Sequence, residues 1–272
     1  YYLLIGSFCD YVSGGRNNES FCLQWFLSLQ STYKVRLFRF ENELCLGISI
    51  KEQVYNIPYL HIDNERYYIF SQGNKRSIPS IYTYDNDLDI ALKALTLELK
   101  EYPLFKDDPF YRQFQAVNIP PFQSCVNKNR IAFLDDYPHS ELTIYMNAMG
   151  SSDLNTSVLP VLREAIANKS KAEAANLLLS FMHRNFAYQT DQEQFGYERP
   201  FFVDECFYYP YNDCEDRSVL YAYLIRKLLG LYIILLKYPG HVATAIHFTD
   251  EIAGDYILHQ NKKYLICDPT YI

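Results

Sequence analysis

The sequence predicts an α+β protein in which helices pack on antiparallel sheets. One observation is the apolar three- and four-residue spacing over residues 219–229, which predicts an amphipathic helix that ends at Gly230. Another is the series of short β-rich runs that follows, separated by the turn signals Tyr238-Pro239-Gly240 and Gln260-Asn261-Lys262. Strands joined by such short turns form hairpins, so the sheet is expected to be antiparallel.

The other elements follow from the same two periodicities. Apolar stripes predict helices over 20–30, 158–167 and 171–184. Alternating or β-rich runs predict strands over 34–37, 44–50, 59–62, 66–70, 90–99, 130–134, 141–146, 231–237, 241–248, 255–258 and 263–268. Prolines punctuate the middle of the chain as expected loop residues, at Pro103, Pro109, Pro120, Pro121 and Pro138. The middle region is therefore predicted to be a β-rich insert.

Composition limits the functional classes. Of 272 residues 49% are hydrophobic, which is enough for a core and excludes a disordered chain. The net charge is −7 and no basic patch or nucleic-acid motif is present, so no nucleic-acid partner is expected. No apolar run is long enough for a membrane span. The seven Cys show no metal-binding spacing and no Gly-rich phosphate loop occurs, so neither a metal nor a cofactor is expected.

The chain opens on Tyr1 without an initiator Met. It is therefore expected to be a mature or trimmed piece of a protein, and the absence of a signal peptide leaves its compartment open. Export to the periplasm or cell surface and a cytoplasmic location are both compatible with this sequence.

Cys214 is the first candidate catalytic residue. Asn212 and Asp213 are good N-cap types, so Cys214 is expected in the first turn of the helix. Unpaired backbone N–H groups and the helix dipole favour a thiolate there. The neighbouring carboxylates of Asp213, Glu215 and Asp216 oppose it, so a partner cation is needed, and a protonated imidazole would serve.

His241 and Asp268 supply the imidazole and a carboxylate. His241 opens a predicted strand, and Ala243 and Ala245 on the same face leave room for a helix start. Asp268 ends the last predicted strand. Neighbouring strands lie about 4.7–4.9 Å apart, so His241 and Asp268 could hydrogen-bond across the sheet. A thiol, a base and a group that orients the base make up a nucleophilic triad.

The segment from about Leu177 to the end resembles the transglutaminase-like superfamily, whose core is a papain-like cysteine-hydrolase arrangement. About a third of the chain carries the resemblance, through Phe181 to Tyr188, Asp213-Cys214-Glu215-Asp216, His241-Val242-Ala243 and Asp268-Pro269-Thr270-Tyr271. It implies that Cys214 is the nucleophile, His241 the general base and acid, and Asp268 the orienting residue. The chain departs from the family pattern at Asn212, where many members have Gly, and at Val242 and Ala243, where many have an aromatic residue soon after the His.

The triad predicts a cysteine-dependent amide or peptide hydrolase that works through an acyl-thioester. Its substrate would be a protein or peptide, with cell-wall peptide among the candidates. An acyl transferase acting on protein glutamine and a non-catalytic scaffold with a relict triad are the alternatives. The backbone N–H of Cys214 could stabilise the oxyanion, with a side-chain donor from Gln194, Tyr209 or Tyr211.

Residues 20–70 repeat the predicted layout of residues 218–268. Ser20 aligns with Ser218 and Leu37 with Leu235 at an offset of 198, whereas Tyr59 aligns with Tyr256 and Tyr67 with Tyr264 at 197. The triad positions then hold Arg16, Glu43 and Ser71. The sequence therefore predicts a degenerate copy of the catalytic fold over 1–75, a β-rich domain over 76–153 and a catalytic domain over 154–272. Chance recurrence of a helix with four strands is the alternative.

Overall fold

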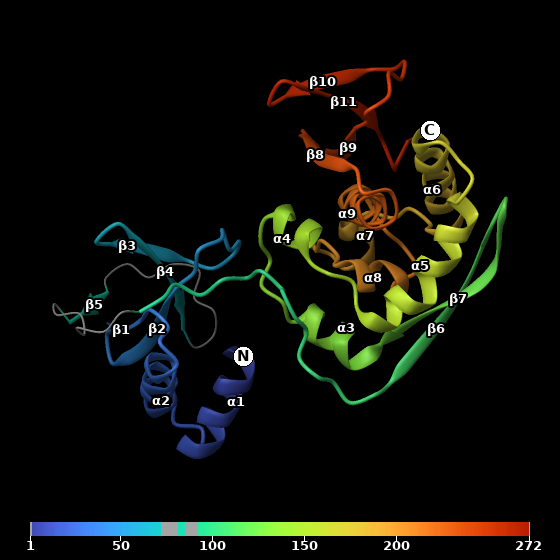
Figure 1. Ribbon diagram of the computed structural model, residues 1–272. Helices are drawn as coiled ribbons and strands as arrows, with labels where there is room; N and C mark the ends of the chain where they lie inside the picture. Colours follow the sequence, from blue (N-terminus) through green and yellow to red (C-terminus); the bar gives the residue numbers. More distant parts are fainter. Residues whose placement is uncertain (1, 72–80, 85–91, 272) are drawn as a thin grey trace. The chain divides into compact units, whose positions relative to one another are not determined.

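The chain forms two compact units in a computed structural model that describes residues 2–71, 81–84 and 92–271 (Figure 1). Unit 1 comprises Tyr1–Leu97 with Pro138–Glu141, and unit 2 comprises Glu98–Tyr137 with Leu142–Ile272. Each combines helices with antiparallel strands, so the α+β prediction is confirmed. The boundary predicted at residue 153 falls inside unit 2, and the one predicted at residue 75 lies outside the described residues.

Unit 1 is a pair of helices and a five-stranded antiparallel sheet. The helices are α1 (Tyr2–Ser13) and α2 (Asn17–Gln30), and the strands are β1 (Val35–Phe40), β2 (Glu43–Ser49), β3 (Tyr59–Ile62), β4 (Glu65–Phe70) and β5 (Tyr82–Thr83). The spatial order is β3-β4-β2-β1-β5. Phe38, Cys45, Tyr67 and Ile69 form a buried cluster on the sheet, which is the expected result of alternating apolar side chains along strands.

Unit 2 holds most of the helices and two sheets. Its helices are α3 (Lys128–Asp135), α4 (Leu142–Asn147), α5 (Ser152–Ile166), α6 (Lys171–Asn185), α7 (Asp191–Gln194), α8 (Val203–Tyr208) and α9 (Cys214–Leu224). A hairpin pairs β6 (Pro109–Ala116) with β7 (Ile119–Asn127), and the four-stranded sheet β10-β11-β9-β8 contains β8 (Tyr232–Tyr238), β9 (His241–His247), β10 (Tyr256–His259) and β11 (Lys262–Cys267). A π-helical turn, Ile225–Leu229, continues α9 to Gly230, whose φ of 66° ends the helix as predicted.

Two predicted strands of the middle region are helices. Residues 130–134 lie in α3, where the Asn127 side chain accepts a hydrogen bond from the Asn129 N–H at 2.9 Å and caps the helix. Residues 141–146 fall largely within α4, which buries Ile144 and Tyr145. Both segments contain β-branched or aromatic residues that favour strands, and burial of a helical face outweighs that preference.

The rest of the middle region also differs from the prediction. Pro109, Pro120 and Pro121 lie within β6 and β7 rather than in loops. A two-stranded ribbon has two free edges, where a proline costs no ladder hydrogen bond. The predicted strand over 90–99 includes residues 90 and 91, which lie outside the described part. Lys93 and Leu95 make only isolated parallel bridges, to Tyr33 and Ile50.

The two larger sheets share one arrangement. In each unit four strands follow a helix, α2 before β1 to β4 and α9 before β8 to β11. Their spatial orders are β1-β2-β4-β3 and β8-β9-β11-β10. The helix packs on the second strand of its set in both units, α2 on β2 and α9 on β9.

The register of the two sheets agrees as well. Each residue of β1 and β2 corresponds to the residue 198 positions later in the chain, and each residue of β3 and β4 to the one 197 positions later. Residues that pair across strands in unit 1 then correspond to residues that pair across strands in unit 2. Both second hairpins turn through two residues of positive φ, Asp63-Asn64 and Gln260-Asn261. The matching pairs include Val35↔Ile48 with Ile233↔Ile246, Leu46↔Phe70 with Thr244↔Cys267, and Tyr59↔Tyr68 with Tyr256↔Leu265. These are the offsets that the sequence alignment predicts.

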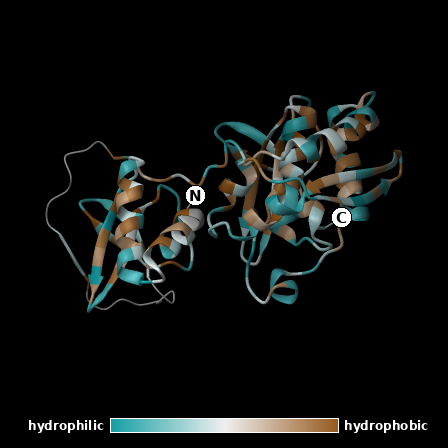
Figure 2. Ribbon diagram, turned by 90° about the horizontal axis from the view of Figure 1, so that it is seen from below, coloured by the Kyte–Doolittle hydropathy of each residue, from teal (hydrophilic) through white to brown (hydrophobic). Residues whose placement is uncertain are grey.

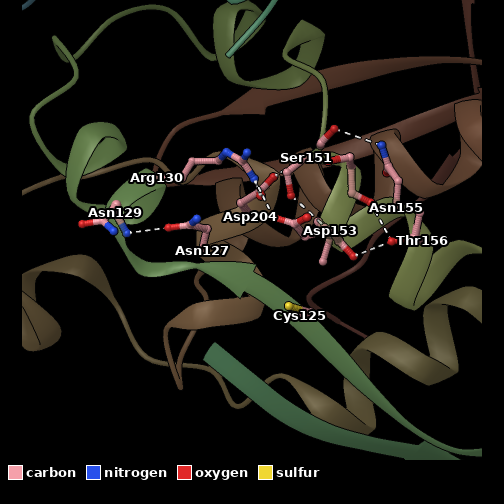
Figure 3. Close-up of polar contacts among 12 residues, drawn as sticks. Cys125, Asn127, Asn129, Arg130, Ser151, Asp153, Asn155, Thr156 and Asp204 are labelled. Carbon is pink, nitrogen blue, oxygen red and sulfur yellow. Dashed lines mark hydrogen bonds and ion pairs between the residues drawn. The ribbon is translucent and has the colours of Figure 1, made fainter. Parts of the chain in front are cut away.

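A buried ionic network joins three elements of unit 2 (Figure 3). Asp204 of α8 is fully buried and accepts a hydrogen bond from the Ser151 N–H at 3.0 Å. Arg130 of α3 approaches Asp204 at 3.5 Å and Asp153 at 3.6 Å. Ser151 also caps α5 by accepting the Leu154 N–H. Removing one partner of such a buried group costs more than the bond itself contributes, so this network fixes α3, α5 and α8 together.

Hydrophobic and hydrophilic residues alternate along the ribbons of both units (Figure 2). This is the pattern of elements that bury one face and expose the other. Among the described residues, no helix has the length and apolar character needed to cross a membrane.

Gly47 of β2 tests the packing of unit 1. A Cβ at this position would lie 2.1 Å from Cε2 of Phe38, a buried core ring. Gly47→Ala should therefore destabilise unit 1 by about 1–3 kcal/mol through overpacking. Urea denaturation followed by fluorescence of Trp25, the single Trp, reports on this unit.

Gly6→Ala is the matched control. Gly6 lies inside α1, and its added Cβ would meet only Gln24 Oε1, at 4.0 Å. Alanine is the better helix former, by roughly 0.5–1 kcal/mol, so this variant should be as stable as the parent chain or more so. Equal stability of Gly47→Ala and the parent chain would contradict the packing described for Phe38.

Candidate active site

The start of α9 positions Cys214. Asp213 is the N-cap, and it exchanges hydrogen bonds with Asp216 in a capping box, in which the Asp213 N–H donates to Asp216 Oδ2 at 3.2 Å. Cys214 is the first helical residue, as predicted, and is 7% exposed. The cap therefore fixes the backbone before Cys214, at Asp213, and after it, at Asp216.

The Cys214 thiol is held in its protonated form. Burial raises its pKa first, and the Glu215 carboxylate adds to this by accepting the thiol hydrogen bond at 3.0 Å and by its charge. A hydrogen bond with the backbone of Val242 acts in the opposite direction. The thiolate that the helix start alone would favour is therefore outweighed by burial and by the adjacent carboxylate.

His241 and Asp268 form a hydrogen-bonded pair. Nε2 of His241, the first residue of β9, lies 2.7 Å from Oδ2 of Asp268, which follows β11. The other carboxylate oxygen of Asp268 accepts the Thr270 N–H at 2.8 Å and the Tyr271 N–H at 3.3 Å. Because β9 and β11 are neighbours in the sheet, the pairing expected across the strands is present. The bond to Asp268 fixes the orientation of the imidazole and leaves Nδ1 for another partner.

Helix α9 packs on strand β9 (Figure 1). Ser218 Oγ donates to the Val242 carbonyl at 3.0 Å, and the Cys214 thiol contacts the backbone of the same residue. Ala243 and Ala245, further along β9, are both buried. Cys214 thus lies beside the residue that follows His241. Among the described groups, its side-chain hydrogen-bond partner is Glu215 and not the imidazole.

Carboxyl groups gather around Cys214. One donor atom from each of Asp191, Glu198 and Glu215 lies within 4.8 Å of the others, and the same holds for Asp191, Asp213 and Asp216. Burial raises the pKa of Asp213 to about 9 and that of Asp191 to about 7, with the charge of Glu215 as a further cause. These groups therefore hold protons that exposed carboxyls would release.

The donor chemistry of this cluster suits a hard cation such as Ca²⁺ or Mg²⁺, since such ions prefer oxygen ligands. Shared protons also relieve the crowding: burial raises the pKa of Glu198, and the charge and hydrogen bond of Glu215 raise it further. Sequence reasoning missed this cluster because its members come from α7, the loop at residue 198 and α9. Local spacing gives no signal for a group assembled in this way.

Two of these carboxyls also hold the loop before α8. Asp191 Oδ2 accepts the Arg199 N–H at 2.5 Å, and Asp216 Oδ1 accepts the Phe201 N–H at 2.8 Å. The Arg199 guanidinium in turn donates to Glu205 at 2.5 Å. Buried carboxylates that satisfy backbone donors are structural partners, so this loop is fixed to the start of α9.

Two tyrosine rings flank His241, and a third lies near Cys214. The Tyr271 ring centroid lies 5.1 Å from that of His241, and the Tyr238 ring stacks at 6.5 Å. Burial, with the proximity of Cys214 as the next cause, raises the pKa of Tyr188 to about 12. The three rings remain substantially exposed, and exposed aromatic rings of this kind favour contact with a ligand.

The predicted oxyanion donors occupy different settings. Gln194 ends α7, the short helix whose first residue, Asp191, lies in the acidic cluster, and its buried Oε1 has no described partner. Tyr211 is half-exposed and bridges to Ala187. Tyr209 stacks on Phe201 and packs against Arg199. The roles of these side chains stay predictions.

Comparisons of the chain with protein-family models, with curated proteins and with solved structures found no match. The chemistry of this region therefore has to be inferred from its geometry. Its elements are a capped helix start bearing a thiol, an adjacent imidazole oriented by a carboxylate, and a surround of carboxyls and tyrosines.

Glu215→Gln should lower the pKa of Cys214, because it removes a negative charge beside the thiol. One pKa unit is a tenfold change in thiolate population, so iodoacetamide should alkylate Cys214 several-fold faster at pH 8 in the variant. Mass spectrometry of the individual cysteine peptides measures this rate. The exposed Cys22 in the same digest is the reference and should not change. An unchanged rate at Cys214 would remove Glu215 as a cause of its protonation.

Asp213→Asn should flatten the pH dependence of unit 2 stability. The native Asp213 carboxyl keeps its proton up to about pH 9, whereas the unfolded one releases it near its ordinary pKa of about 3.9. Between these two pKa values the native chain binds more protons than the unfolded chain, so the free energy of unfolding falls as pH rises. Asn retains the N-cap acceptor. The measurement is the slope of unfolding free energy between pH 6 and 9 by circular dichroism; parallel slopes for the two chains would contradict the raised pKa.

Proposed function

We propose that unit 2 is a cysteine-dependent amide or peptide hydrolase with a transglutaminase-like, papain-like core. The observation that carries this proposal is the 2.7 Å bond between His241 Nε2 and Asp268 Oδ2, made where the Cys214 end of α9 packs on the same strand start. Helix-start thiol, strand-start imidazole and orienting carboxylate are the three roles of a cysteine triad. Peptides, including cell-wall peptides, are the proposed substrates.

The proposed reaction begins when Nδ1 of His241 takes the Cys214 proton. The sulfur attacks the amide carbonyl, and the tetrahedral oxyanion is stabilised by the Cys214 backbone N–H. The C–N bond breaks as the imidazolium gives its proton to the leaving amine, which leaves a thioester. His241 then deprotonates a water molecule that attacks the thioester. The carboxylic acid product departs and the thiol is reprotonated.

The resting hydrogen bond of the thiol sets a condition on this reaction. Sγ of Cys214 donates to Glu215, so the thiol has to turn from the carboxylate toward the imidazole before proton transfer. Hydrogen bonds of this kind are often loose or misdirected without substrate and tighten in the complex. A substrate that displaces Glu215 would couple binding to activation of the nucleophile.

Acyl transfer is the second candidate. In that reaction an amine replaces water in the resolution of the thioester, which requires a site that excludes water. The side chains of His241 and Asp268 are 20% and 24% exposed, so water reaches the pair, and this favours hydrolysis. The third candidate is a scaffold with a relict triad, favoured by the raised pKa of Cys214.

Cys214→Ala should reduce amidase activity to background, because no other group can form the thioester. Peptide, glutamine-amide and cell-wall peptide libraries provide the assay, with amine release and hydroxylamine trapping of acyl-enzyme as readouts. Asp268→Asn should keep a residual rate, lowered by about 10²- to 10⁴-fold. Cys22→Ala, at an exposed position of unit 1, is the matched control. Activity retained by Cys214→Ala would refute the nucleophile; no activity in the parent chain on any library would favour the scaffold.

A further inference from the structure

A cavity of about 370 Å³ lies in unit 1 between the start of α2 and the turn that leads into β2. Its wall combines charged, amide and apolar side chains, among them Arg16, Asn18, Glu19, Phe21, Glu43 and Leu44. The volume is within the range of small-molecule sites, which is roughly 300–1,000 Å³. Nothing in the proposed chemistry of unit 2 uses this cavity.

The cavity is lined by the residues that correspond to Cys214 and His241 of unit 2, whereas Ser71, which corresponds to Asp268, does not line it. The offset of 198 that relates β1 and β2 to β8 and β9 converts Arg16 into position 214 and Glu43 into position 241. A helix start and a strand start therefore meet at corresponding points of the two units. Arg16 and Glu43 can provide neither a thiol nor an imidazole, so binding without catalysis is the chemistry left to this position.

Asn18 makes one wall of the cavity rigid. Its Nδ2 donates to the Asn42 carbonyl at 2.9 Å, and its Oδ1 accepts the Leu44 N–H at 2.8 Å. This side chain joins the first turn of α2 to the beginning of β2. In unit 2, Ser218 makes the corresponding link from α9 to Val242, the position equivalent to Leu44. A wall held by two such bonds is pre-organised for a ligand.

Arg16 supplies the cationic side of the cavity. Its Nε group donates to the Ser13 carbonyl at 2.8 Å and pairs with Glu19 at 2.7 Å. Neither Nη group is bonded to a residue that the structure describes, and the side chain is 71% exposed. These donors have the geometry that binds a carboxylate. The orientation of the Nε group by two contacts reduces the entropy lost when a ligand binds.

Glu19 and Glu43 supply the anionic side. With one Arg and two Glu, the lining does not favour a ligand that carries only negative charge. A carboxylate can accept several hydrogen bonds, so an ammonium group can join contacts that these residues already make. Phe21 and Leu44 add apolar surface beside the charges.

We propose that this cavity is a binding site for zwitterionic ligands, namely free amino acids or short peptides with both termini free. The ligand carboxylate pairs with Arg16, and its ammonium group pairs with Glu43 and Glu19. The site is non-catalytic, and it is independent of the reaction proposed for unit 2.

Calorimetric titration of the full chain with dialanine tests the proposal, with N-acetyl-dialanine and dialanine amide as probes that lack one charge. Dialanine should bind saturably, and removal of either charge should weaken binding about tenfold, the value of a charge-assisted hydrogen bond. Arg16→Gln and Glu43→Gln should each produce a similar loss. Arg39→Gln is the matched control, since Arg39 stacks on Tyr82 and does not line the cavity.

Cys214→Ala separates this site from the proposed catalytic site, because dialanine binding should survive it unchanged. Trp25 fluorescence during denaturation verifies that unit 1 of each variant is folded. Three outcomes would overturn the proposal: no saturable binding up to about 10 mM, well above typical small-ligand affinities; equal binding of the capped peptides; or loss of binding in Cys214→Ala with retention in the folded Arg16→Gln.

Discussion

The close contact between the start of α9 and the start of β9 is the constraint on which unit 2 depends. Ser218 and Cys214 of the helix both reach the backbone of Val242, the second residue of the strand. The Asp213 cap sets the exit of the preceding loop, and Ser218 fixes the helix to the Val242 carbonyl. Once this contact forms, the thiol, the imidazole and the surrounding carboxyls have little freedom left.

Two electrostatic effects oppose each other near this contact. The exposed N–H groups of a helix start attract negative charge, and Asp213, Glu215 and Asp216 all lie there. Burial then makes each charge costly, which is why carboxyl pKa values rise and protons are shared. The nucleophile is subject to the same balance. Its reactivity is therefore controlled by the charge state of its neighbours as much as by its own position in the helix.

Local patterns predicted much of this structure. The helix from Cys214 to Gly230, the hairpins after it and the approach of His241 to Asp268 all follow from nearby residues and two-residue turns. The predictions failed where tertiary burial decided the outcome, as in α3 and α4, whose sequences favour strands. The bond from Cys214 to Glu215 and the recruitment of Asp191 and Glu198 depend on rotamers and on distant segments. No periodicity encodes such contacts, so a single sequence could not reveal them.

The strand order of unit 2 has a consequence for how the chain acquires its function. β8–β9 and β10–β11 are local hairpins that close through two-residue turns, and such hairpins form within microseconds. The bond between His241 and Asp268 needs a third event, the docking of β11 on β9. A one-residue error in that docking would turn Asp268 to the opposite face of the sheet. The contact between His241 and Asp268 therefore depends on the register of a long-range strand pairing, whereas the start of α9 is set by local caps.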